Sequence, residues 1–223
     1  SINDYLRCLA TIYTQLRVLG YKGSNPFTSE CCARVKVAKR RPKYLTSQEV
    51  EKAMQVGERV GRDTHLFLAL GVYGGLRKGE LLNLRWKDID FDRAGADGEA
   101  IGCMYIWESE GHELKTSGSS AVVPLHPSLK GILSHYKPIH SEPGDYVVRP
   151  EVTMRRLSGY RWDARKSLAI VGAAIGRDIN PHMLRHTFAS LLAQRGVSLY
   201  KISAWLRHES IATTEVYAHL CPV

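Results

Sequence analysis

The sequence predicts a mainly α-helical fold with one small antiparallel β-sheet, an α+β arrangement. Apolar side chains recur every three or four residues through most of the chain, which is the period of a helix with one buried face. Between residues 88 and 125 the period shifts towards two, which is typical of β-strands. A chain of 223 residues can bury a sizeable core, and its length allows one domain or two.

The first 43 residues differ from the rest in pattern and composition. Residues 2–19 place apolar side chains at helical spacing, and Gly20 is expected to end this helix. The next part, residues 28–43, is predicted to be an extended basic linker. Its last ten residues hold six Lys or Arg and no acid, which suits either a contact with DNA or an ordinary solvated linker. We therefore expect a first segment over 1–27, this linker, and the main domain over 44–223.

Capping signals and periodicity define the elements of the main domain. Thr46 and Glu49 form a capping box that begins its first helix, and Gly74 with Gly75 separates the second helix from the third. In chain order the pattern predicts helices at 46–60, 64–73 and 78–84, strands at 89–91, 101–107 and 121–125, and helices at 127–136, 151–175, 181–195, 199–206 and 212–220.

The charge of the chain indicates a polyanionic partner. The formal net charge is +9 and the pI is about 9.4. Residues 88–113 hold eight acids and one Arg, whereas residues 149–207 hold eleven basic side chains and three acidic ones. This asymmetry favours DNA on one side of the domain only. No apolar run is long enough to span a membrane. Five cysteines, odd in number and without ligand spacing, favour a reduced cytoplasmic protein.

One predicted helix near the C-terminus gathers polar side chains on a single face. Asn180 suits its N-cap, and Pro181 suits its first turn, where a missing N–H costs nothing. His182, Arg185 and His186 fall at positions i, i+3 and i+4, so they share one face. Most of the other side chains of this helix are apolar and suit the hydrophobic core, so imidazole and guanidinium groups clustered on one face indicate a functional site. Both groups can donate hydrogen bonds to a phosphate.

The C-terminal region resembles the signature of the tyrosine recombinase, or phage integrase, family. That signature is His-x-x-Arg, then a further histidine, and then the nucleophilic tyrosine. His182, Arg185, His208 and Tyr217 occupy these positions in this order. The residue before His208 is Arg207, where the family usually has glycine; this exchange changes the turn geometry or adds a phosphate contact.

Two upstream segments extend the resemblance, which then covers residues 44–220 in the family's order. Residues 75–90 (GLRKGELLNLRWKDID) resemble the first arginine box, with Arg77 in the catalytic position. Residues 115–125 resemble the hairpin that delivers the catalytic lysine, which is Lys115 here. The resemblance implies a tyrosine-recombinase-like catalytic domain.

The resemblance also implies a chemistry and a role for each residue. Tyr217 is the nucleophile that forms a covalent 3′-phosphotyrosine, and rejoining then needs no ATP. Arg77 and Arg185 bind the phosphate oxygens through parallel charge-assisted hydrogen bonds. Lys115 is the general acid for the leaving 5′ oxygen. The remaining two members of the set, His182 and His208, donate to the phosphate or assist proton transfer from the tyrosine.

The family further implies partners and a cellular setting. Residues 1–27 correspond to the end of an N-terminal core-binding domain that clamps DNA, so we expect the chain to be part of a longer protein. Double-stranded DNA is the expected partner, and the full-length protein is expected to self-associate in a tetrameric synapse on DNA. We expect no membrane association, no cofactor and no metal. The expected location is the cytoplasm of a bacterium or of a phage-infected cell, at the nucleoid.

Other interpretations of these residues stay open. Arg77 with Glu80 at i+3 also fits an ordinary helix ion pair, and Lys115 also fits a plain turn lysine. His186 is expected to pack or bond in the core, although its spacing from His182 also occurs in zinc sites. For the function as a whole, the alternatives to a site-specific recombinase are relaxation of DNA by a type IB topoisomerase and a non-catalytic DNA-binding remnant.

Overall fold

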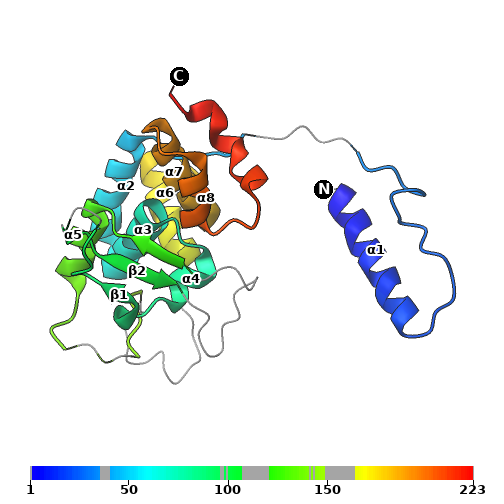
Figure 1. Ribbon diagram of the computed structural model, residues 1–223, viewed down its shortest axis with the longest axis horizontal. Helices are drawn as coiled ribbons and strands as arrows, with labels where there is room; N and C mark the ends of the chain where they lie inside the picture. The colour runs from blue at the N-terminus through cyan, green and yellow to red at the C-terminus, as the bar shows by residue number, and fades with distance from the viewer. Residues whose placement is uncertain are drawn as a thin grey trace. The chain divides into compact units, whose positions relative to one another are not determined.

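The computed structural model describes residues 2–35, 41–95, 98, 100–106, 121–140, 142, 144–148 and 164–222. The chain divides into two compact units, residues 1–41 and 42–223 (Figure 1). Among the described residues, no helix combines the length and the apolar character needed to cross a bilayer.

The first unit is a helix followed by an irregular segment, residues 19–35, that turns back against it. Helix α1 (Ile2–Val18) confirms the predicted N-terminal helix. The irregular segment is tied to the helix through Asn3, whose side-chain amide donates to the carbonyl of Val35 over 2.7 Å, and through an edge-to-face contact between the rings of Tyr13 and Phe27. No described residue of α1 is buried. The exposed apolar side chains of this helix include Ile2, Tyr5, Leu9 and Ile12.

The second unit is built around α3 (Arg62–Gly74), which is buried along almost its whole length. Three helices pack against it at close range, and a fourth makes a smaller contact: α2 (Ser47–Val60), α5 (Pro127–Tyr136), α7 (Pro181–Gln194) and α6 (Ala164–Ile175). The contact of α3 with α7 depends on Gly71, because a Cβ added there would lie 2.8 Å from the Cβ of Leu184. A small residue thus lets the helix that carries the candidate site approach the centre of the domain.

A three-stranded antiparallel sheet covers one side of this helical core (Figure 1). Its strands lie in the order β1 (Ile89–Asp90), β2 (Cys103–Ile106) and β3 (Ala121–Pro124). Met104 pairs with Ile89 on one side and Val123 on the other, and all three side chains are buried. The predicted fold class, mainly α with one small antiparallel sheet, is confirmed.

Most of the remaining elements follow the prediction. Helices α4 (Lys78–Asn83) and α8 (Leu199–Leu206) lie where the sequence predicts helices, and α6 begins at Ala164 within the predicted 151–175. The 3₁₀ helix η1 (Trp86–Asp88) lies between a predicted helix and a predicted strand, where no element was predicted. Residues 149–163 lie outside the described part of the chain.

The α-helix predicted over residues 212–220 is wrong in type. The structure has two 3₁₀ helices there, η2 (Ile211–Thr213) and η3 (Glu215–Leu220). Thr214 lies between them, fully buried, with its hydroxyl 2.8 Å from Nδ1 of His208. Because the chain is anchored at this point, it makes two short turns with i→i+3 hydrogen bonds instead of one continuous helix.

Candidate active site

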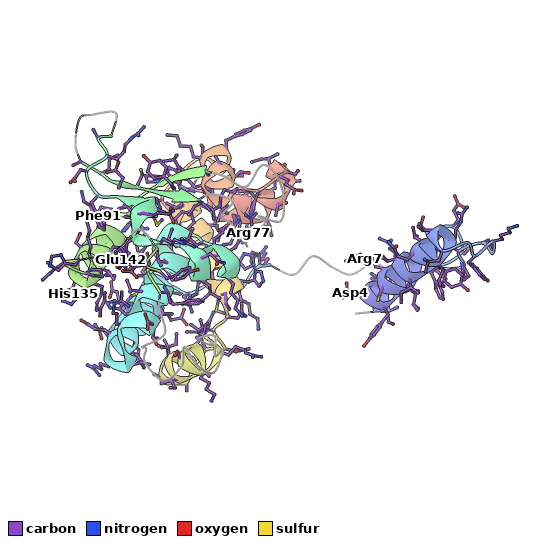
Figure 2. The ribbon with its side chains drawn as sticks, turned by 90° about the horizontal axis from the view of Figure 1, so that it is seen from below. Asp4, Arg7, Arg77, Phe91, His135 and Glu142 are labelled. Carbon is purple, nitrogen blue, oxygen red and sulfur yellow. The ribbon has the colours of Figure 1, made fainter. Side chains whose placement is uncertain are left out.

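Arg77 lies at the start of α4, directly after the turn that ends α3. Gly75 ends α3 in the left-handed conformation, with φ of 62°. One carboxylate, that of Glu80, accepts both from the backbone N–H of Arg77 over 2.7 Å and from its Nη1 over 2.9 Å. The other terminal nitrogen, Nη2, donates to the carbonyl oxygen of Arg207 over 2.7 Å. The side chain is 34% exposed, so part of it is open to solvent. Arg77 lies well apart from the end of the domain that carries Phe91 and His135 (Figure 2).

Arg185 reaches the same place from α7. Its Nη1 donates to the carbonyl of Gly75 over 2.7 Å, and its Nη2 donates to the carbonyl of Leu206. Arg77 and Arg185 therefore bind the carbonyls of two consecutive residues, 207 and 206, at the end of α8. Burial and the charges of Arg207 and Arg77 lower the pKa of Arg185 to about 9, so it stays charged at neutral pH. Because a guanidinium has five N–H groups, both arginines keep donors beyond these contacts.

His208 lies on the turn that follows α8, next to both arginines. Its Nδ1 pairs with the hydroxyl of Thr214 at 2.8 Å. Burial lowers the pKa of His208 to about 4, with further contributions from the charges of Arg185, Arg77 and Arg207. The imidazole is therefore neutral at neutral pH, and the surrounding field favours an anion at this position.

Arg207 adopts the left-handed backbone conformation that favours glycine. Its φ is 55°, and among the described residues it is the one non-glycine with positive φ. Its side chain is buried and paired with Glu80. Nη2 of Arg207 lies 2.5 Å from Oε2 of Glu80, and Nε lies 3.2 Å from Oε1. Burial would raise the pKa of Glu80, but the charge and hydrogen bonds of Arg207 outweigh it, with the backbone of Arg77 and the charge of Arg185 adding to them, and the pKa is lowered.

Tyr217, on η3, is buried against α7 and α8, with 2% of its surface exposed. Its hydroxyl lies 2.5 Å from Nδ1 of His186. Burial raises the pKa of the phenol to about 12, against the charge of Arg185, which lowers it. Burial, together with the charges of His182 and Arg185, lowers the pKa of His186. The phenol and the imidazole are therefore both neutral at neutral pH.

The structure brings together five of the six residues predicted for the site, and the sixth cannot be described. His182 is exposed on α7, one turn before His186, and its charge acts on that imidazole. Lys115 lies within residues 107–120, outside the described part of the chain. The described residues contain no cluster of three or more His, Cys, Asp or Glu side chains suited to a metal ion.

The sequence did not indicate all the partners of two residues in this region. His186 was expected to pack or bond in the core, but its partner is the hydroxyl of Tyr217. Glu80 was expected at most as the partner of Arg77, but it also binds Arg207. For His186 the available signal was its position on the same helical face as His182; no local pattern indicates the pairing of residues 80 and 207, because they meet only in the folded domain.

The chain is similar in sequence to proteins of one known family. The sequence profile of the phage integrase family matches residues 43–222. The chain belongs to the phage integrase family. A tyrosine recombinase of Pseudothermotoga lettingae is 30% identical over 221 residues, which cover 99% of this chain and 70% of that protein. The tyrosine recombinase XerA of Pyrococcus horikoshii is 29% identical over 186 residues, which cover 82% of this chain and 58% of that protein.

Solved structures of recombinases and integrases share the fold. A crystal structure of XerA recombinase matches with a TM-score of 0.61 at 22% identity, over 99% of this chain and 72% of that one. The Tn1549 transposon integrase in complex with circular intermediate DNA matches with a TM-score of 0.66 at 19% identity, over 97% of this chain and 74% of that one. The relatives named here are all recombinases or integrases, so the topoisomerase and binding-remnant alternatives are not favoured.

Proposed function

We propose that this chain supplies the catalytic site of a site-specific DNA recombinase, which cleaves and rejoins DNA strands through a covalent 3′-phosphotyrosine on Tyr217. The observation that carries the proposal is the meeting of Arg77 and Arg185 at two consecutive carbonyls, beside His208. These residues come from three distant parts of the sequence. A cluster of cations beside a buried phenol suits attack of that phenol on a phosphodiester.

Each residue of the site has one part in the proposed reaction. The Tyr217 oxygen attacks the phosphorus, a bond to the tyrosine forms, and the bond to the 5′ oxygen breaks. Arg77 and Arg185 hold the phosphate oxygens, on which charge builds in the transition state, and a preorganised donor at such a position contributes about 3 kcal/mol. Lys115 protonates the leaving 5′ oxygen. His208 and His182 donate to the phosphate. The reverse steps rejoin a strand without an external energy source, because the phosphotyrosine bond conserves the energy of the phosphodiester.

The proposed partner is double-stranded DNA, since the solved relatives include the Tn1549 integrase in complex with DNA and XerH bound to a difH substrate. The chain spans 58% to 70% of the relatives named above. In the whole protein we place residues 1–27 at the end of a DNA-clamping domain and residues 28–43 in a basic linker, and we assign recombination to a tetrameric synapse in the cytoplasm, at the nucleoid.

The experiment that tests this function traps the intermediate. A duplex that binds this chain is first selected from a pool of random sequences, and a nick is then placed so that the cleaved end diffuses away. Incubation should give a protein–DNA adduct that withstands SDS. Tyr217→Phe should bind the same duplex and give no adduct, because only the attacking oxygen is lost. An adduct of equal yield with Tyr217→Phe would remove Tyr217 from the role of nucleophile.

A further inference from the structure

His186 faces the one atom on which the proposed reaction depends, the hydroxyl oxygen of Tyr217. The distance between Nδ1 of His186 and that oxygen is 2.5 Å, and both side chains are packed between α7 and η3. The pair lies at the edge of the cationic cluster, because the charge of Arg185 acts on the phenol as well as on the imidazole. A phosphate held by Arg185 would therefore lie beside the phenol.

The other two histidines of the region have different surroundings. Nδ1 of His208 is occupied by the hydroxyl of Thr214, and His182 is exposed on the preceding turn of α7. Among the described residues, the hydrogen bond recorded for the Tyr217 hydroxyl is the one with His186. A nucleophilic phenol needs a group that takes its proton as it attacks, and that group must lie within hydrogen-bond reach of the oxygen.

We infer that His186 is a further catalytic residue, the general base that accepts the proton of Tyr217. This inference rests on the proposed function. During cleavage the proton moves from the phenol oxygen to Nδ1 of His186, the bond from oxygen to phosphorus forms, and the bond to the 5′ oxygen breaks as that oxygen takes a proton from Lys115. During rejoining the 5′ hydroxyl gives its proton back to Lys115 as it attacks the phosphorus, the bond from phosphorus to the tyrosine oxygen breaks, and that oxygen regains its proton from His186.

The charges around His186 suit this role. His182 and Arg185 face it from its own helix, Tyr217 faces it from η3, and His208 faces it from the turn after α8. Burial, with smaller contributions from His182 and Arg185, lowers the pKa of His186, so its imidazole is uncharged at neutral pH. An uncharged imidazole with its proton on Nε2 has a free lone pair on Nδ1, which is the atom that faces the phenol.

A test on DNA compares His186→Ala and His186→Asn with the wild type, using the selected nicked duplex at saturating concentration. Asparagine places a polar atom near the position of Nδ1 but takes no proton. Adduct formation at pH 7 should be about 100-fold slower in both variants, the low end of the range for a general base. The matched control is His135→Asn, an exposed histidine of α5 that lies well apart from Arg77 (Figure 2) and should leave the rate unchanged.

The pH profile separates proton transfer from mere support of the tyrosine. The wild-type rate should rise with pH through the lowered pKa of His186 and then level off. In both variants this step should be absent, and the rate should rise steadily as hydroxide replaces the missing base. If adduct formation by His186→Ala at pH 7 is as fast as in the wild type or faster, or if the variants keep the wild-type pH profile, His186 only holds the side chain of Tyr217 in place. Either result would overturn the inference.

A duplex with sulfur in place of the bridging 5′ oxygen identifies the proton on which His186 acts. A thiolate leaves without being protonated, so Lys115→Ala should recover its rate on this duplex, whereas His186→Ala should stay slow. Recovery of His186→Ala would place it at the leaving group and would overturn the inference.

A measurement without DNA distinguishes failure of this inference from failure of the proposed function. Nitrogen-15 NMR of the imidazole at pH 7, assigned with His186→Asn, should show a proton on Nε2 and none on Nδ1. A proton on Nδ1 would make the phenol the acceptor and would overturn the inference, whatever the outcome with DNA. Absence of any Tyr217-dependent adduct in the wild type would instead contradict the proposed function.

Discussion

Arg207 and Glu80 form a buried ion pair next to Arg77, the partly exposed arginine of the site. The shortest distance, between Nη2 and Oε2, is 2.5 Å, and both side chains are 1–2% exposed. The same carboxylate also binds Arg77, whose other terminal nitrogen donates to the carbonyl of Arg207. Residues 77, 80 and 207 thus form one closed network, which joins the start of α4 to the turn that carries His208.

This network predicts the effect of restoring glycine at position 207. Glycine relieves the left-handed conformation, which costs a non-glycine residue roughly 1–2 kcal/mol. The same change leaves Glu80 as a buried carboxylate without its main partner, at a cost of about 3–5 kcal/mol. We therefore expect Arg207→Gly to lower the free energy of unfolding by about 2–3 kcal/mol in urea denaturation.

A second change identifies the cause of that loss. Adding Glu80→Gln to Arg207→Gly should restore much of the stability, because the buried charge is removed. If Arg207→Gly alone unfolds at the wild-type urea concentration, the ion pair does not stabilise the domain.

Gly75 is predicted to accept no side chain. Its φ is 62°, and an added Cβ would lie 2.5 Å from Cδ1 of Phe188. Its carbonyl also accepts the hydrogen bond from Arg185. A shift of this turn would therefore displace Arg185, which holds the phosphate in the proposed reaction. Gly75→Ala should lower the free energy of unfolding by more than about 1 kcal/mol. The control is Gly131→Ala, on α5 with open space around it, which should raise stability by about 1 kcal/mol. Equal effects of both changes would contradict this account of the turn.

The lowered pKa of His208 predicts acid sensitivity. In the unfolded chain a histidine titrates near 6.5, whereas burial and the neighbouring arginines hold His208 at about 4. Between these values the unfolded state binds more protons than the folded state. The contribution of His208 to the free energy of unfolding is therefore fully present above about pH 6.5 and falls as the pH drops towards 4. The loss from this group is at most about 3 kcal/mol.

The measurement is the free energy of unfolding at pH 7 and pH 4.5. His65, His126 and His186 also have lowered pKa values and act in the same direction. His208→Asn should therefore reduce the loss between the two pH values without abolishing it. An unchanged loss in this variant would show that His208 is not protected from protonation in the folded state.

The basic linker predicts a steep dependence of DNA binding on salt, because each neutralised phosphate releases counterions. Replacing Arg40 and Arg41 with Ala should lower the slope of log affinity against log salt by up to about 2. A matched loss of charge, Lys52→Ala with Arg59→Ala on exposed positions of α2, should leave the slope nearly unchanged. Equal slopes in the wild type and the linker variant would mean that these arginines do not contact DNA.

The site also predicts cleavage in the presence of excess EDTA. The phosphate charge in the proposed reaction is met by Arg77, Arg185 and the histidines, so no divalent ion has to supply it. Adduct formation should proceed at the same rate with and without the chelator. Loss of the adduct on chelation and its return with one divalent ion would contradict this mechanism.

Much of the fold and of the site could be predicted from the sequence, and the remainder has a physical explanation. The capping box at Thr46 and the cap at Asn180 are local signals, and both helices begin where these residues predict. The 3₁₀ helices at the C-terminus were predicted as one α-helix, because the contact of Thr214 with His208 depends on the folded turn. The partners of His186, Glu80 and Arg207 were missed for the same reason: each contact joins residues far apart in the chain.

The central claim is that Tyr217 becomes covalently attached to the 3′ end of a cleaved DNA strand. The most direct measurement is mass spectrometry of peptides from the adduct formed on the selected nicked duplex. The account predicts a single modified peptide, with a 3′-phosphonucleotide on Tyr217. Attachment through a 5′-phosphate, or attachment to another of the chain's tyrosines, would contradict it.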